Sequence, residues 1–243
     1  KTCIRRWLKS GEAMPHSLTQ TSAQSAPAPG RPGRWPLSAI RVAVFFCLNV
    51  DIPFQSVVEY SYQAGTEKLQ EQMDRCLTNS VDRLFLPNVD LASIPLVMET
   101  TKLYPENCFP MLGLHPCSVK EDYIRVLGQL EKEIPKHQIY AIGEIGIDLY
   151  WEQDSLVWQQ DAFRTQINWA KDLGLPISIH CREAFDQVFE ILEEEQDGRL
   201  FGVFHCFTGN LEQAHRAIGL QFSLGIGGVV TYKKAGLDAV VQQ

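Results

Sequence analysis

The sequence lacks the features that mark several large protein classes. Its longest apolar run near the start covers seven residues, 42–48, whereas a helix that crosses a membrane needs about 20. The seven cysteines form no CxxC pair, and their odd number argues against a disulfide framework and a structural zinc site. We therefore expect a cytoplasmic protein in a reducing environment, with no membrane partner.

Acidic charge dominates, but it is unevenly spread. The 243 residues carry a formal charge of -7, and 45% of them are apolar, enough for a sizeable core. Residues 1–50 hold seven basic residues against the single acid Glu12, a balance of +6 that leaves -13 for residues 51–243. A domain with a net charge of -13 repels nucleic acid unless bound cations offset that charge, so a phosphate substrate would require metal ions.

Composition divides the chain near residue 60. Proline, serine and glycine crowd the first fifty residues, as in PAPGRPGRWP, a composition that does not build a packed element. We predict a largely disordered basic segment over 1–60 and a barrel domain over 61–243. The richness of the segment in Arg and Ser is typical of an organellar transit peptide, and the abrupt change of composition also fits a segment foreign to the native protein.

Beyond residue 63, short apolar segments alternate with amphipathic ones. The apolar segments predict strands at 81–89, 108–116, 139–149, 176–180, 202–207 and 222–228. The amphipathic segments predict helices at 65–79, 92–104, 118–134, 155–173, 182–195, 210–219 and 235–243. Gly174 is expected to stop the fourth of these helices. Strict alternation predicts an α/β fold of parallel βα units.

A parallel sheet of this kind either opens into a doubly wound layer or closes into a TIM (β/α)8-type barrel. A doubly wound nucleotide-binding sheet needs a glycine fingerprint after its first strand, but residues 90–93 read DLAS. We therefore predict a barrel.

Titratable residues recur at the ends of separate predicted strands, namely His115, Glu144, His180 and His205. In a barrel the C-terminal strand ends converge on one face, which carries the active site. Imidazole and carboxylate groups suit a divalent cation, and a carboxylate can bridge two. The pattern indicates metal-assisted hydrolysis.

Arg182 follows His180 by two residues. Its planar guanidinium could meet a substrate phosphate. Alternatively, it pairs with Glu183 or Asp186 at the start of a helix.

Five segments resemble the TatD family of metal-dependent deoxyribonucleases, which are amidohydrolase-type TIM barrels. The segments are MLGLHPCSV (111–119), AIGEIGIDLYW (141–151), LPISIHCREAFD (175–186), GVFHCFTGNLEQA (202–214) and FSLGIGGVVTYK (222–233). The resemblance covers residues 63–243. It implies a hydrolase that cleaves phosphodiester bonds of DNA, at single strands or frayed ends and often as a 3′-to-5′ exonuclease. Separately, we expect a monomer. Two divalent ions per site, Mg, Mn or Zn, are implied as cofactors.

The resemblance also implies roles for individual residues. Glu144 is expected to be catalytic and to bridge the two ions, with His180 and His205 as further metal ligands. Arg182 is expected to assist catalysis and contact the substrate. His115 and Thr208 are expected near the substrate.

Two parts of the family pattern have no counterpart here. The family's first strand ends in an H-x-H pair, but this chain has no histidine between His16 and His115. The family's last strand carries an aspartate in an ETDSP-like segment, whereas the acids after His205 are Glu212 and Asp238, both in predicted helices. We therefore expect an incomplete barrel, with strands 2 to 7 recognisable and strand 8 missing, and a weakened two-metal site.

Two alternatives remain open. The chain could be a catalytically inactive barrel fragment or misassembled gene product. It could also be an amidohydrolase acting on a small molecule, although those sites commonly bridge their metals with a carboxylated lysine, and the bridging position here is Glu144.

Overall fold

The computed structural model describes residues 66–79 and 81–243. Within them, six strands form one sheet: β1 Leu84–Pro87, β2 Cys108–Leu112, β3 Ala141–Asp148, β4 Ile177–Arg182, β5 Gly202–Phe204 and β6 Phe222–Leu224. The helices are α3 Thr66–Thr78, α4 Ile94–Leu103, α5 Tyr123–Glu133, α6 Leu156–Leu173, α7 Phe185–Glu195, α8 Leu211–Gly219 and α9 Leu237–Val241. The predicted disordered segment 1–60 lies outside the described residues.

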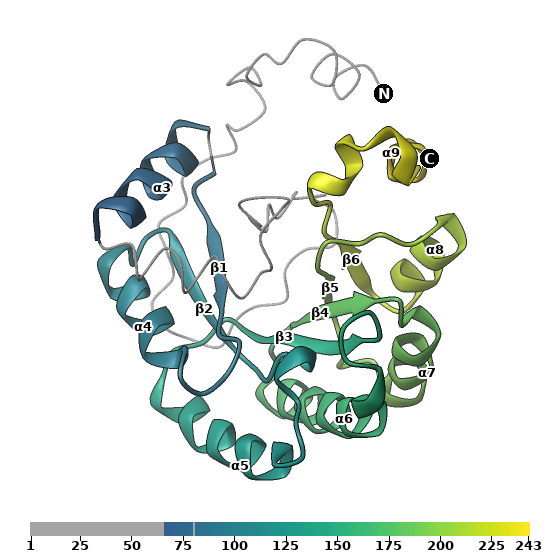
Figure 1. The fold of residues 1–243 in the computed structure, drawn as a ribbon, viewed down its shortest axis with the longest axis horizontal. Helices are drawn as coiled ribbons and strands as arrows, with labels where there is room; N and C mark the ends of the chain where they lie inside the picture. Colours follow the sequence, from purple (N-terminus) through teal and green to yellow (C-terminus); the bar gives the residue numbers. More distant parts are fainter. Residues whose placement is uncertain (1–65, 80) are drawn as a thin grey trace. The chain divides into compact units, whose positions relative to one another are not determined.

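Strand order confirms the predicted parallel βα architecture. The order is β1-β2-β3-β4-β5-β6, and every neighbouring pair is parallel. A doubly wound sheet reverses its order at a switch point, whereas a barrel adds each new strand on the same side. Figure 1 shows α4 to α8 outside the strands. The described residues thus form part of a TIM-type barrel.

Isoleucines of the two central strands make the core. Ile142, Ile145, Ile147, Ile177 and Ile179 are wholly buried and pack with aromatic side chains of the covering helices. A strand buried on both faces reads as a continuous apolar run, as expected for a parallel sheet covered by helices. The core therefore holds β3 and β4 in place, and these strands carry much of the site.

Several predicted boundaries were wrong where local turns end an element early. The predicted strand 108–116 stops at Leu112, and the predicted helix 118–134 begins at Tyr123 after a 3-10 turn over Pro116–Ser118. The predicted strand 202–207 stops at Phe204, since Cys206 has a positive φ of 45° that extended strands do not allow. The predicted strand 222–228 stops at Leu224. Gly174 ends α6 in the left-handed conformation, as expected.

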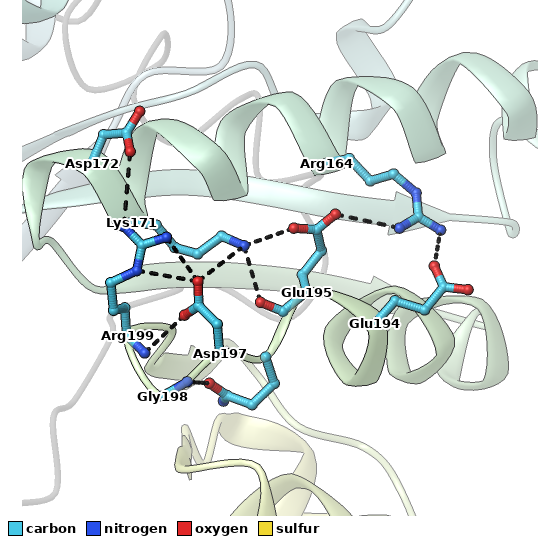
Figure 2. Close-up of polar contacts among 9 residues, drawn as sticks. Arg164, Lys171, Asp172, Glu194, Glu195, Asp197, Gly198 and Arg199 are labelled. Atoms are coloured by element: carbon cyan, nitrogen blue, oxygen red, sulfur yellow. Dashed lines mark hydrogen bonds and ion pairs between the residues drawn. The ribbon is translucent and has the colours of Figure 1, made fainter.

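A cluster of charges ties α6 to α7 at the ends that lead into β4 and β5 (Figure 2). The Lys171 ammonium is nearly buried and lies 2.7 Å from a carboxylate oxygen of Glu195 and 3.8 Å from one of Asp197. Arg164 and Arg199 extend the cluster on either side. This is the N-terminal end of the strands, where charged residues in such barrels serve stability rather than chemistry.

Among the described residues, no helix is both long and apolar enough to cross a membrane.

Candidate metal site

Glu144 in the middle of β3 and His180 in β4 converge with His115, which caps the turn after β2. His180 Nδ1 lies 3.2 Å from both Glu144 Oε1 and His115 Nε2. One ligand atom from each of the three residues lies within 4.8 Å of the others. Glu144 and His115 are buried, and His180 is half-buried. Two neighbouring strands and the turn after β2 thus supply one compact set of nitrogen and oxygen donors.

Strand register explains the convergence. Gly146 of β3 pairs with His180 of β4, which brings the glutamate two residues earlier beside the histidine ring. Gly146 has φ of 142°, and a Cβ there would lie 2.0 Å from the His180 carbonyl oxygen. Glycine is therefore required for β3 and β4 to approach this closely.

His115 is held by the turn after β2. Its Nδ1 accepts a hydrogen bond from the Cys117 backbone N–H, which starts the 3-10 turn. This contact orients the ring so that its Nε2 faces His180 Nδ1 at 3.2 Å.

Asp148, which our sequence reasoning missed, fixes the His180 ring from the other side. Its Oδ2 lies 2.8 Å from His180 Nε2, while its Oδ1 accepts hydrogen bonds from the backbone N–H groups of Tyr150 and Trp151. A carboxylate that accepts from one ring nitrogen leaves the other free to bind a metal, an arrangement common around metal-ligating histidines. The period-two alternation along β3 could have found it, since positions 144, 146 and 148 share one face.

Electrostatics separates the protonation states of the two histidines. Burial, reinforced by the neighbouring His180, lowers the pKa of His115 to about 3, which keeps it neutral. Burial also opposes the charging of His180, but hydrogen bonds to Asp148 and Glu144 outweigh it and raise its pKa. Burial likewise opposes ionisation of Glu144, yet the charges of His205 and His180 hold its pKa below the usual range. The metal-free site thus holds an ionised Glu144 beside a protonated His180, which releases its proton when a cation binds.

The other predicted residues lie around this group. His205 follows β5; its backbone N–H donates to the Ile179 carbonyl, and its Nε2 lies 3.4 Å from Cys206 Sγ. It influences the charge of Glu144, but the group of three ligands found among the described residues does not include it. Arg182 ends β4, and Thr208 is exposed in the loop before α8.

The donor set fits a divalent cation. Two imidazoles and one carboxylate are ligands that Zn, Mn and Fe accept, and three protein ligands leave a coordination position open. The contact from Asp148 to His180 adds the outer support that such sites carry. Among the predicted ligands, Glu144 and His180 lie within reach of one ion, joined by His115, which the sequence had associated with the substrate.

A barrel-type βα fold with histidine and carboxylate donors gathered at its strand ends defines the class of metal-dependent hydrolase barrels. Residues 58–243 match the family described as TatD related DNase. The chain belongs to this family.

Individual relatives agree with this assignment. The chain is 35% identical over 168 residues to the uncharacterized metal-dependent hydrolase YabD of Bacillus subtilis, covering 69% of this chain and 65% of the relative. It is 32% identical to the 3'-5' ssDNA/RNA exonuclease TatD of Yersinia pseudotuberculosis, covering 56% of this chain and 52% of that protein. The chain thus spans about half to two thirds of the length of these two relatives.

A solved structure supports the fold. The crystal structure of YJJV, a TatD homolog from Escherichia coli, matches with a TM-score of 0.67 and 27% identity, over 72% of this chain and 68% of that one. The partial barrel described above is therefore similar to a barrel already observed in a member of the family.

Proposed function

We propose that this chain is a metal-dependent hydrolase that cleaves phosphodiester bonds of DNA from the 3′ end. The observation that carries the proposal is the convergence of the buried His115 and Glu144 with the half-buried His180, whose ligand atoms lie within 4.8 Å of one another. The Yersinia pseudotuberculosis relative is named a 3'-5' ssDNA/RNA exonuclease, which supports a nucleic acid as substrate.

In this proposal Glu144, His180 and His205 remain the ligands expected from the family, and His115 joins them. A bound divalent ion supplies Lewis-acid polarisation of the phosphate and lowers the pKa of water. Glu144 contributes the negative charge that attracts a cation to the two histidines. Asp148 holds His180 with its Nδ1 turned toward Glu144, so that the donor set exists before a cation arrives.

Arg182 and Thr208 are proposed to contact the substrate. The guanidinium lies at the end of β4, two residues beyond His180, and is exposed. A planar, permanently charged fork can bind two phosphate oxygens at once. Since residues 51–243 carry -13, this cation and the bound metal would offset repulsion of the DNA locally.

A hydrolysis assay tests the proposal. The full chain, incubated with Mn²⁺ and a single-stranded oligonucleotide labelled at its 5′ end, is expected to give a ladder shortened from the 3′ end. Glu144→Ala should abolish the ladder. The matched control is Glu190→Ala, which removes an exposed carboxylate on α7 and should leave the rate unchanged.

Product release no faster than that of Glu144→Ala would refute the proposal and support an inactive barrel fragment. Release of product from small amide or lactone substrates, with the oligonucleotide left intact, would instead support an amidohydrolase.

A further inference from the structure

Two neighbouring aromatic side chains are exposed directly after β3. Tyr150 and Trp151 are 45% and 61% exposed, and their rings meet edge to face with centroids 4.6 Å apart. Exposed aromatic surface costs free energy in water, and clusters of it mark binding surfaces. These two rings are therefore a candidate binding surface.

A cation from the next strand completes the patch. The Arg182 guanidinium carbon lies 3.9 Å from the centroid of the Tyr150 ring and 5.6 Å from that of Trp151. Asp148 and Arg182 are partners in the β3–β4 register, and the Leu149 N–H donates to the Arg182 carbonyl. We call Tyr150, Trp151 and Arg182 the aromatic platform.

Hydrogen bonds anchor the backbone of Tyr150 and Trp151. Asp148 Oδ1 accepts from the N–H groups of Tyr150 and Trp151 at 2.9 and 2.7 Å. The buried Gln159 side chain accepts a hydrogen bond from the Asp148 N–H and donates one to the Glu152 carbonyl. It thus holds both ends of the loop that carries Tyr150 and Trp151. A surface ordered before binding loses less entropy when a ligand arrives.

Asp148 also connects the platform to the candidate metal site. The carboxylate that supports the loop through Oδ1 contacts His180 through Oδ2 at 2.8 Å. One buried side chain therefore sets the position of the platform relative to the metal-ligating ring.

We propose that the aromatic platform stacks an unpaired nucleobase of the strand whose phosphodiester occupies the metal site, and that it thereby selects single-stranded nucleic acid. The inference rests on the proposed function for its substrate. Flat aromatic and guanidinium groups fit the π-face that every base presents, without regard to sequence. A base inside a duplex is stacked on both faces, so it cannot use the platform unless it is unpaired.

Binding experiments separate the contribution of the base from that of the backbone. Fluorescence anisotropy measures the affinity of the chain for two labelled decamers, an oligothymidylate and an abasic strand with the same number of phosphates. Both titrations are done in Ca²⁺, and a gel confirms that the strands stay intact. The wild-type chain should bind the base-bearing strand about tenfold more tightly or better. The double variant Tyr150→Ala/Trp151→Ala should bind both strands equally.

Matched controls exclude a loss of folding. Tyr140 is an exposed tyrosine at the opposite end of β3, and Trp158 is a partly exposed tryptophan on α6. Tyr140→Ala and Trp158→Ala should retain the wild-type preference for the base-bearing strand. Tyr150→Phe/Trp151→Phe keeps an aromatic ring at each position and should retain the preference too.

The outcomes distinguish this inference from the proposed hydrolysis. If the wild-type chain binds the two decamers equally, or if the double alanine variant keeps the wild-type preference, the platform does not bind a base, whatever the hydrolysis assay shows. If the preference depends on the two rings but Mn²⁺ produces no ladder, the base platform stands and the hydrolysis is refuted. A loss of preference in Tyr140→Ala as large as in the double variant would also overturn the inference.

Discussion

Replacing Asp148 by Asn should weaken metal binding without removing a ligand. The Asp148 carboxylate uses Oδ1 for two backbone N–H groups and Oδ2 for His180 Nε2. An asparagine can keep the two backbone bonds with its single oxygen, but it then turns an NH₂ group toward Nε2. Because that group donates, Nε2 must accept, and the ring proton moves to Nδ1. Nδ1 is the nitrogen that faces Glu144, so its lone pair is lost to a metal.

The expected loss is about 10- to 100-fold in metal affinity, the range seen when outer partners of metal-ligating histidines are removed. This corresponds to about 1.4 to 2.7 kcal/mol. Isothermal titration of the metal-free chain with Mn²⁺ measures it directly, and urea unfolding in EDTA separates it from any loss of stability.

Asp161→Asn is the matched control. The Asp161 carboxylate also accepts a side-chain hydrogen bond, from the Tyr123 hydroxyl at 2.8 Å, but it lies on α6 outside the donor set. It should leave Mn²⁺ affinity unchanged. If Asp148→Asn binds Mn²⁺ as tightly as the wild-type chain, Asp148 does not set the His180 tautomer and the reasoning is wrong.

Three further predictions concern the fold. Gly202→Ala should destabilise the chain by several kcal/mol, since its Cβ would lie 2.0 Å from the Ile177 carbonyl oxygen between β4 and β5; a urea midpoint equal to that of the wild-type chain would contradict this. Both carboxylate oxygens of Glu193 contact the Arg216 guanidinium, and this lowers the pKa of Glu193. The ion pair therefore stabilises the fold at pH values above the ordinary glutamate pKa of about 4.3, and this stabilisation is lost as the pH falls below that value and the carboxylate is protonated. Glu193→Gln should therefore cost about 0.2 to 1 kcal/mol at pH 7 and nothing near pH 2, as measured by urea unfolding at both pH values. Burial raises the pKa of the Cys108 thiol to about 12, so iodoacetamide at pH 8 should label it only after unfolding, as read by mass spectrometry.

The alternation of strands and helices was predictable because it depends on the local spacing of apolar residues in the sequence. The six predicted strands and seven predicted helices all occur, since apolar runs of strand length between amphipathic segments leave few other ways to bury the apolar surface. The boundaries were less predictable. The ends of β2 and β5 depend on the cap at His115 and on the positive φ of Cys206, and the spacing of apolar residues predicts neither.

The site was predictable only in part. Strand-end position pointed to His115, Glu144, His180 and His205 as a group. It did not show that the His115 ring contacts that of His180 across 65 residues of sequence, or that Asp148 lies behind His180. The roles of Arg182 and Thr208 at the substrate stay predictions.

The sequence by itself determined the class of fold, the family, and the residue types from which a metal site is built, because periodicity and motif order are properties of the linear chain. Only the tertiary structure decided which donors face one another. That depends on the register of β3 against β4 and on the glycine at 146 that lets the strands approach. The same register lays Arg182 over Tyr150, so the candidate metal site and the aromatic platform both follow from how two parallel strands are aligned.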